Sequence, residues 1–464
     1  MKNSSIVFFI VALVVAWPLA LQAQNGQVCE AQNGAKCLYV TPTGNGDGQF
    51  ASPGKLSEML PLLSKGDFLY LRGGEYSETH SIDNYDVVLN LEKYLNFTNP
   101  QPTQTEPITI KSYPGEQAIL RGDFSSTCVV IEEQEHLVLE NLEIRDCLNS
   151  GIWLYTDYGA SDIALRGIHI HNIQYDDNSG FISVVGYHDV IIENGLFHDY
   201  IPRTDGYVGF YLKFFLAKDV VVRNNELYGN GGGLYYKHGE AILNQGGFTR
   251  VENNHFHDLT QAAVQSNQNR MEIRDNLMIG SGISLHLEDG TKAVFTTGTV
   301  IEFNTLVDSG IGLNAGSNDG SYLGLFGLGA KQTSIRRNIL YNSDYSFWRY
   351  GSDEQYNEGI GLNTSKNCFY QSSGNQVFDY FSNDNNGVLG GEYSLLGFQN
   401  LLGQDLNSIE SDPQFVNPAQ GNYRLSDDSA CKTLGAGVRF DPIQEDESMC
   451  FPVLVKGKWV VICL

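Results

Sequence analysis

The sequence predicts a parallel β-helix, a solenoid in which each coil adds one short strand to each of several sheets. One apolar phrase recurs along the chain with starts 22 to 34 residues apart, and such spacing of β-branched segments with glycine and asparagine turns is typical of solenoids. The 3.6-residue periodicity that a helical solenoid requires is missing. The copies are LVLENLEIRDC (137–147), IALRGIHIHNI (163–173), VIIENGLFHDY (190–200), VVVRNNELYGN (220–230), TRVENNHFHDL (249–259), MEIRDNLMIGS (271–281), TVIEFNTLVDS (299–309) and TSIRRNILYNS (333–343).

Two positions of the phrase are apolar in every copy, the third and the eighth, as expected for one inward residue on each of two short strands. Asparagine recurs at the sixth position, between these strands. Asparagine tolerates left-handed backbone, and stacked amides can bond one another, so the pattern predicts an asparagine ladder at a sharp turn. Its members are Asn225, Asn254, Asn276, Asn304 and Asn338.

A further strand precedes each phrase, with the pattern glycine, apolar, any, apolar, any. Aligned on the first residue, the copies are Gly151–Tyr155, Gly180–Val184, Gly209–Lys213, Gly233–Lys237, Ala262–Ser266, Gly282–His286 and Gly310–Asn314. The third and fifth positions are expected to point outward, because side chains alternate along a strand. That outward set is Trp153 with Tyr155, Tyr211 with Lys213, Tyr235 with Lys237, and Ser284 with His286. The alignment predicts a groove with aromatic and cationic side chains.

The ends of the chain differ from its middle. Residues 1–23 have a lysine, an apolar run and small residues, which is typical of a signal peptide cut after Ala23. Residues 24–80 are expected to form an N-terminal cap with a helix near 55–64, because a solenoid otherwise exposes a sheet edge. The β-helix is then expected over 81–440, with 352–410 as irregular coils or a long loop, 412–425 as an exit cap and 441–464 as a tail.

Composition narrows the class of protein. A net charge of −25 argues against nucleic acid as a partner. It does not argue against an acidic sugar polymer, because the predicted groove itself is basic. Apart from the signal peptide no apolar stretch is long enough to span a bilayer, so we expect an exported, soluble monomer. Export favours pairing of the eight cysteines, for which we expect Cys29–Cys37, Cys128–Cys147 and Cys431–Cys450.

Together these features resemble the pectate-lyase superfamily of right-handed parallel β-helices over roughly residues 38–440. The stretch GNGGGLYYKHG (229–239) is similar to the glycine-rich stretch that carries the base lysine in one pectate lyase family, which maps that base onto Lys237. The pair YLK and YYKHG is similar to the paired motifs of the chondroitinase B and alginate lyase family, which makes Lys213 the base and Lys237 its partner. Lysine replaces that family's arginine here, and its calcium-binding glutamates are absent.

The resemblance implies β-elimination of a uronic-acid-containing polysaccharide. A lysine removes the C5 proton as the neutral amine while a cation stabilises the enediolate. If Lys213 and Lys237 occupy one slot of adjacent coils, about 4.8 Å apart, their repulsion favours one neutral amine. His238 and His286 are candidate acids or groove contacts. The candidate sugar-binding residues are Trp153, Tyr155, Tyr211 and Tyr235.

A calcium site is expected beside the lysines. Asp176, Asp177 and Asp205 come just before the strands on successive coils, and stacked carboxylates there could hold Ca²⁺.

Other interpretations remain open from the sequence. Lysines on a solenoid face are often solvated charges, and aspartate is favoured in turns for backbone reasons. A non-catalytic carbohydrate-binding or cell-surface β-helix needs only the aromatic strip. A glycoside hydrolase needs paired carboxylates across a cleft, and no such series is recognisable here.

Overall fold

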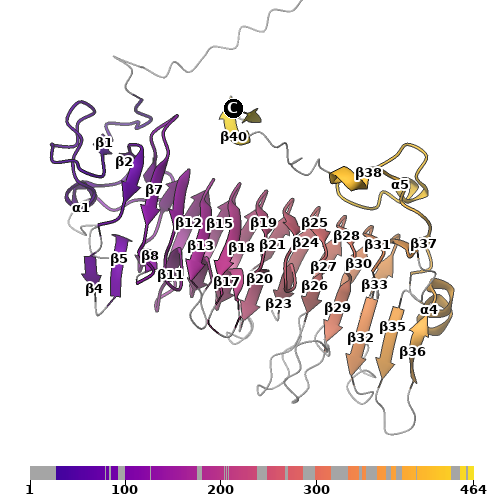
Figure 1. The fold of residues 1–464 in the computed structure, drawn as a ribbon. Coiled ribbons are helices and arrows are strands. Elements are labelled where there is room, and N and C mark those ends of the chain that lie inside the picture. Colours follow the sequence, from indigo (N-terminus) through magenta and orange to yellow (C-terminus); the bar gives the residue numbers. More distant parts are fainter. Residues whose placement is uncertain are drawn as a thin grey trace, which may run out of the picture.

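In the computed structural model the chain is a right-handed parallel β-helix (Figure 1). The structure describes residues 28–463 except 79, 83–84, 92–99, 126, 175–179, 203, 205, 207, 238–247, 267–269, 286–297, 315–332, 344–346, 352–362, 373–377, 383–388, 404, 440–449 and 456–457. Over these residues no helix is long and apolar enough to cross a membrane.

Three long sheets make up the solenoid, with 12, 12 and 13 strands. Each coil supplies one strand to sheet 1, the next to sheet 2 and the third to sheet 3, and successive coils pair in parallel. The exceptions are antiparallel pairs at the two ends of sheet 3, β4 with β5 and β35 with β36. Most of the buried apolar side chains form one continuous core from Leu38 to Phe398, and two smaller clusters lie outside it.

The strands of sheet 1 are β1 (Cys37–Val40), β2 (Phe68–Leu71), β6 (Ile108–Ser112), β9 (Leu137–Glu140), β12 (Ser161–Arg166), β15 (His188–Glu193), β18 (Lys218–Arg223), β21 (Thr249–Glu252), β24 (Met271–Arg274), β27 (Val300–Glu302), β30 (Ser334–Arg336) and β33 (Asn363–Ser365). The strands of sheet 2 are β3 (Gly74–Tyr76), β7 (Ala118–Arg121), β10 (Leu142–Arg145), β13 (His169–Gln174), β16 (Leu196–Ile201), β19 (Glu226–Tyr228), β22 (His255–His257), β25 (Leu277–Ile279), β28 (Thr305–Val307), β31 (Ile339–Tyr341), β34 (Cys368–Tyr370) and β37 (Ile409–Glu410). The strands of sheet 3 are β4 (His80–Ile82), β5 (Tyr85–Asn90), β8 (Thr127–Glu132), β11 (Ile152–Tyr155), β14 (Ile182–Val185), β17 (Phe210–Phe215), β20 (Gly232–Lys237), β23 (Val264–Ser266), β26 (Ile283–Leu285), β29 (Ile311–Asn314), β32 (Phe347–Gly351), β35 (Phe378–Ser382) and β36 (Leu389–Tyr393).

The asparagine ladder is confirmed at the turn between sheets 1 and 2. The side-chain Oδ1 of Asn276 accepts from the backbone N–H and the Nδ2 of Asn254, each at 3.0 Å. The same two bonds link Asn225 to Asn254, Asn276 to Asn304 and Asn304 to Asn338. The ladder continues to Asn367, so buried amides satisfy one another along this turn.

A second ladder, of alternating charge, follows the outward ends of the sheet 1 strands from β6 to β30. Glutamate of one coil lies between cations of the coils above and below; Glu193, for example, lies 2.8 Å from Arg166 and 2.6 Å from Arg223. Cross-strand pairs of opposite charge favour one register over its neighbours. The series is Lys111, Glu140, Arg166, Glu193, Arg223, Glu252, Arg274, Glu302 and Arg336.

Helical segments lie at both ends of the solenoid (Figure 1). At the N-terminal end α1 (Leu56–Met59) and the 3-10 helix η1 (Leu60–Leu62) place Met59, Leu60 and Leu63 in the core, which confirms the predicted cap. At the other end α4 (Leu395–Leu402) contributes Leu395 and Phe398 to the same core. This second cap lies in a stretch for which the sequence predicted irregular coils.

Beyond β37 the chain turns back along the solenoid (Figure 1). The hairpin of β38 (Phe415–Asn417) and β39 (Asn422–Leu425), with the 3-10 helix η2 (Pro418–Gln420) between them, matches the predicted exit segment. The short helix α5 (Ala430–Thr433) follows, and Arg439 then pairs with Asp275 of a much earlier coil. A last antiparallel hairpin comprises β40 (Cys450–Val455) and β41 (Lys458–Cys463).

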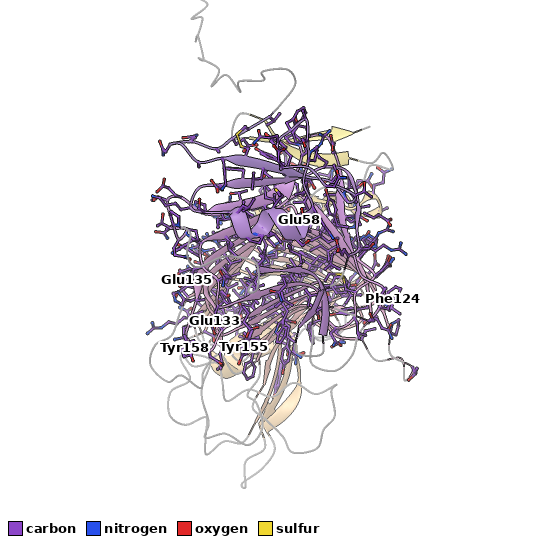
Figure 2. All side chains as sticks on the ribbon, turned by 90° about the vertical axis from the view of Figure 1, so that its left-hand side faces the viewer. Glu58, Phe124, Glu133, Glu135, Tyr155 and Tyr158 are labelled. Carbon is purple, nitrogen blue, oxygen red and sulfur yellow. A yellow bond between two sulfur atoms is a disulfide. The ribbon has the colours of Figure 1, made fainter. Side chains whose placement is uncertain are left out.

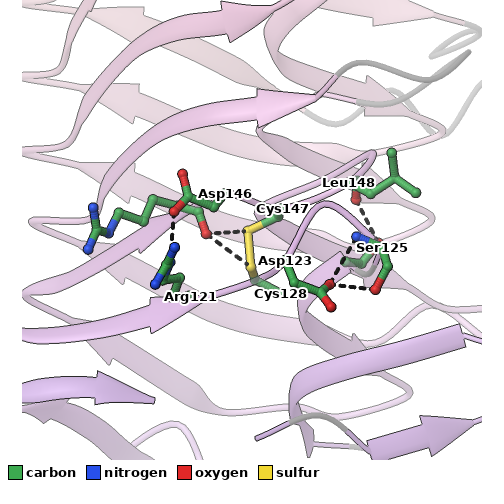
Figure 3. The surroundings of a disulfide bond; sticks show 9 residues. Arg121, Asp123, Ser125, Cys128, Asp146, Cys147 and Leu148 are labelled. Atoms are coloured by element: carbon green, nitrogen blue, oxygen red, sulfur yellow. Dashed lines mark hydrogen bonds and ion pairs between the residues drawn. A yellow bond between two sulfur atoms is a disulfide. The ribbon is translucent and has the colours of Figure 1, made fainter. Parts of the chain in front are cut away.

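Two of the three expected disulfides are present, Cys29–Cys37 and Cys128–Cys147. Figure 3 shows the second beside the ion pair of Arg121 and Asp146, whose Nε and Oδ2 atoms are 2.9 Å apart. The expected Cys431–Cys450 bond is wrong, because Cys431 pairs with Cys368. That bond ties α5 to β34, a coil that the sequence did not predict as regular structure.

Replacing both Cys128 and Cys147 with alanine is expected to lower the free energy of unfolding by about 3 kcal/mol, because the unfolded chain regains the freedom of a loop closed over 19 residues. The Cys29/Cys37 double variant opens a loop of only 8 residues and should lose less. Urea denaturation of both variants checks this. A larger loss in the Cys29/Cys37 variant would contradict the loop-closure explanation.

Candidate functional site

The candidate groove lies on sheet 3, but its two lysines do not occupy the same slot. Lys213 of β17 is directly opposite Tyr235 of β20, and Phe215 is opposite Lys237. The prediction that Lys213 and Lys237 stack in one ladder is therefore wrong by two residues. Their Cα atoms are diagonal neighbours, roughly 8 Å apart for standard strand spacing and rise. Of Lys237 the structure describes the backbone position alone.

The shift arises because Phe210 and Tyr211 turn the corner ahead of the inward-facing part of β17. The inward residues of that strand are Leu212 and Phe214, and Leu212 pairs with Leu234 in the next coil. Tyr211 was predicted to face outward as a sugar-binding residue, and this is wrong. It is fully buried, and its hydroxyl donates to the carbonyl oxygen of Tyr228 at 2.6 Å.

The glycine-rich stretch before β20 has a packing explanation. A Cβ added at Gly231 would lie 2.9 Å from the Tyr211 ring, and one at Gly232 would lie 2.5 Å from the Phe210 ring. At Gly233 it would lie 2.1 Å from the carbonyl oxygen of Ala263 in the next coil. Consecutive glycines therefore admit the two corner rings and the neighbouring backbone. These three glycines of the stretch that resembles a lyase motif therefore have a packing role in this chain.

The outward residues of sheet 3 form two parallel ladders. One, which we call the central ladder, runs along the middle of the strands from β11 to β26. The other runs through the strand ends, with Tyr155, Val185 and Phe215 in register, and the backbone of Lys237 pairs with that of Phe215. The central ladder comprises Trp153, Ser183, Lys213, Tyr235, Gln265 and Ser284.

In the central ladder Lys213 has a small neighbour, Ser183, on one side and an aromatic ring, Tyr235, on the other. Ser183 is nearly buried and is held by Ser150, with the two Oγ atoms 3.1 Å apart, so the coil between Trp153 and Lys213 presents little bulk. Trp153 and Lys213 are thus two coils apart, or roughly 10 Å, and the small side chain of Ser183 lies between them. On its other side Lys213 has its Nζ 6.0 Å from the centre of the Tyr235 ring. The Tyr235 ring in turn stacks on Phe210 at 5.1 Å.

The β11 end of the two sheet 3 ladders is aromatic and acidic. The rings of Trp153 and Tyr155 are 5.7 Å apart, and the Tyr155 hydroxyl donates to Asp157 at 2.6 Å. This hydrogen bond to a carboxylate, with smaller effects from burial and from nearby glutamates, raises the pKa of Tyr155. Figure 2 shows Tyr155 and the 91% exposed Tyr158 on the same edge as Glu133 and Glu135. An anionic group is therefore favoured near Lys213, and an apolar ring face near Trp153.

Five predicted site residues lie outside the described residues. They are the expected calcium ligands and the two candidate groove histidines: Asp176, Asp177, Asp205, His238 and His286. Sequence reasoning also missed Ser183 and Gln265, which share the central ladder with Lys213. The 30-residue separation of Glu193 and Arg223 in sheet 1 also relates Ser183 to Lys213, so aligning the coils on these charges would have found Ser183 but not Gln265.

A pocket of about 560 Å³ lies away from the strip, where the C-terminal segment packs on the solenoid. Its wall includes Arg337, Arg424, Lys432 and Arg439, and the Arg439 guanidinium lies 3.7 Å from the centre of the Phe303 ring. Arg439 is neutralised by its ion pair with Asp275. These contacts of Arg439 hold the returning C-terminal segment on the solenoid. The pocket wall includes none of the predicted site residues.

Comparison with known proteins places the chain among right-handed parallel β-helices. Residues 119–276 match a family model described as right handed beta helix region. No curated protein sequence matches the chain. The fold, with its three parallel sheets and buried asparagine ladder, accounts for this match.

Solved structures similar to this chain include several enzymes of carbohydrate metabolism. The complex of XylC with xylose has a TM-score of 0.50 at 10% identity over 82% of this chain and 87% of that chain. Pectate lyase Pel9A has a TM-score of 0.45 at 12% identity over 86% and 92%. The GH136 lacto-N-biosidase from Eubacterium ramulus has a TM-score of 0.42 at 13% identity over 81% and 68%. Identities this low establish a shared fold alone.

Proposed function

We propose that the protein is a secreted polysaccharide lyase that cleaves a uronic-acid-containing polysaccharide by β-elimination, with a lysine as base. The observation that carries the proposal is the position of Lys213 on the central ladder, between the small side chain of Ser183 and the phenol of Tyr235. Export is supported by the disulfides, which persist in oxidising compartments. The composition of residues 1–23, which is typical of a signal peptide, supports it as well.

Substrate binding would follow the direction of the ladder. One sugar ring would stack its apolar face on the Trp153 ring, and the next sugar unit would lie over the small side chain of Ser183. Its carboxylate then meets the ammonium of Lys213, or that of Lys237 on the next coil. An acidic polymer is thereby drawn to one short cationic part of a surface that is acidic elsewhere.

The chemical step needs one neutral amine and one positive charge. The base lysine takes the C5 proton, the electron pair forms the C4–C5 double bond, and the C4–O4 bond breaks. The other lysine, or Ca²⁺ held by Asp176, Asp177 and Asp205, would stabilise the enediolate. The Tyr235 hydroxyl is suited to protonate the departing O4, because its ring lies beside Lys213. The diagonal register of the two lysines lets them approach different atoms of one sugar.

The direct test is formation of an unsaturated uronide, which absorbs in the near ultraviolet, on alginate, pectate and glycosaminoglycans. The mature protein is expected to produce this absorbance on at least one polymer. A chelator should reduce the rate, and added Ca²⁺ should restore it, if the three aspartates hold calcium. New reducing ends without absorbance would instead show a hydrolase, and neither signal on any polymer would refute the lyase proposal.

A non-catalytic carbohydrate-binding protein is the second candidate. The observation that favours it is the Trp153–Tyr155 ring pair, which provides an aromatic surface without any catalytic group. In that case Trp153→Ala would abolish retention of the protein on an immobilised polysaccharide, and Lys213→Ala would not. Binding without cleavage distinguishes this candidate from the lyase.

A further inference from the structure

Two copies of one side-chain arrangement lie on the outward face of sheet 2, which does not contain the candidate groove. Each copy has a His-x-His pair on one strand and a glutamate on the strand of the preceding coil, directly opposite the first histidine. Glu143 of β10 is opposite His169 of β13, and Glu226 of β19 is opposite His255 of β22. Residues two apart on a strand share one face, so each copy brings three metal-binding groups together.

The Glu226 copy is the better formed. One ligand atom from each of Glu226, His255 and His257 lies within 4.8 Å of the other two. The Nε2 of His257 is 3.1 Å from the Glu226 carboxylate, and its Nδ1 is 2.8 Å from Asp258. A carboxylate behind a histidine orients the other ring nitrogen, as it does behind many metal-ligating histidines.

His255 supplies an independent sign of a missing partner. Both of its ring nitrogens are shut off from solvent, and neither has a hydrogen-bond partner. Buried polar atoms are almost always satisfied, so an imidazole whose two nitrogens both lack a partner indicates a ligand-binding role.

The Glu143 copy repeats this geometry and adds a third histidine. Glu143, His169 and His171 again lie within 4.8 Å of one another, and the Nε2 of His171 is 3.2 Å from the Glu143 carboxylate. The Nε2 of His198, one coil further on, lies 2.9 Å from that of His169. The Nδ1 of His198 is 2.9 Å from Asp199, which repeats the orienting role of Asp258. Arg145 lies 3.5 Å from the Glu143 carboxylate and competes for it.

We propose that Glu226, His255 and His257 bind a divalent transition-metal ion of the Zn²⁺ class, and that Glu143, His169 and His171 form a second, equivalent site. Two imidazoles and a carboxylate suit Zn²⁺, whereas Ca²⁺ prefers oxygen ligands alone. Each ion would join adjacent coils of sheet 2. Ligand atoms up to 4.8 Å apart must close by up to about 1.5 Å around tetrahedral zinc, whose bonds are near 2 Å, and side-chain rotation can supply this.

Zinc titration of the mature protein, followed by dialysis and elemental analysis, tests the proposal. The wild type is expected to retain two Zn²⁺ per chain, His255→Ala one, and the His169→Ala/His255→Ala double variant none. The matched control is His188→Ala, which changes a histidine on sheet 1 whose Nδ1 contacts Asp189, and it should retain two. Glu226→Gln keeps the side-chain size and should weaken binding at one site at least 10-fold, which serves if His255→Ala fails to fold.

The proposal is overturned if the wild type retains no zinc, or if the single and double variants retain as much as His188→Ala. Displacement of bound zinc by millimolar Ca²⁺ would also overturn it, because the donor set is argued to select against calcium. A second readout is the melting temperature, which should rise with Zn²⁺ in the wild type and stay constant in the double variant. None of these measurements depends on the proposed lyase activity.

Discussion

Lys213→Ala is expected to lower the rate of β-elimination by roughly 10²–10⁴-fold if Lys213 is the base, since that is the usual contribution of a general base. Lys213 is on the outward side of β17, between the buried Leu212 and Phe214, so its truncation leaves the core intact. Lys237→Ala is expected to have the complementary effect, mainly raising KM if Lys237 binds the carboxylate. The reverse pattern would exchange the two roles.

The measurement is the initial rate of unsaturated-uronide formation at several substrate concentrations, with the melting temperature as a check on folding. Lys218→Ala is the matched control, because Lys218 begins β18 on sheet 1, only five residues further along the chain. It should retain the wild-type rate. If Lys213→Ala and Lys237→Ala also retain it, neither lysine takes part in the chemistry and the mechanism must be abandoned.

The class of fold was predictable because certain positions of the repeated phrase each have one structural role in every coil. An apolar residue at the third and eighth positions and an asparagine at the sixth correspond to two inward side chains and one buried turn amide. Leu139, Ile144 and Asn276 show each of these directly. Such requirements act within one coil or between identical neighbours, so a single sequence shows them without an alignment.

The candidate groove was harder to predict, because it depends on the register between coils. Aligning glycines placed Lys213 beside Lys237, whereas Gly232 pairs with Phe210 and makes room for its ring. A shift of two residues keeps the inward–outward alternation, so the hydrophobic pattern could not reveal the error. The alternation of glutamate and arginine along sheet 1 does not reveal it either, because Arg223 and Glu252 pair at a separation of 29 residues, whereas Lys213 and Tyr235 pair at a separation of 22.

The second cap and the third disulfide could not be predicted for a different reason. Both depend on contacts between segments far apart in the chain, such as Cys368 with Cys431. Around α4 the phrase is lost, and the apolar residues Leu395 and Phe398 have no repeat to place them. The histidine arrangement on sheet 2 was visible in the sequence as HIH and HFH. These pairs indicate a metal site only when the register shows that a glutamate lies opposite the first histidine of each.

Asn276→Leu is expected to lower the free energy of unfolding by about 3–6 kcal/mol, because each buried polar group left without a partner costs about 1–3 kcal/mol. The Asn276 Nδ2 donates to the carbonyl oxygen of Val251 at 2.9 Å, and its Oδ1 accepts both the backbone N–H and the Nδ2 of Asn254 at 3.0 Å. Leucine of similar size removes all of these bonds at a position with no solvent access, so water cannot replace them.

Asn363→Ala is the matched control for this experiment, since Asn363 is an exposed asparagine of β33 outside the ladder. Its change in stability should stay within about 0.5 kcal/mol. Asn276→Asp separates the two halves of the amide, because it keeps the acceptor for Asn254 but loses the donor to Val251 and buries a charge. It should therefore also destabilise, and more so as pH rises and the aspartate ionises. Denaturant midpoints of the three variants decide the matter. If Asn276→Leu shifts the midpoint no more than Asn363→Ala, the ladder does not stabilise the solenoid, and the apolar core with the charged ladder of sheet 1 must hold adjacent coils in register.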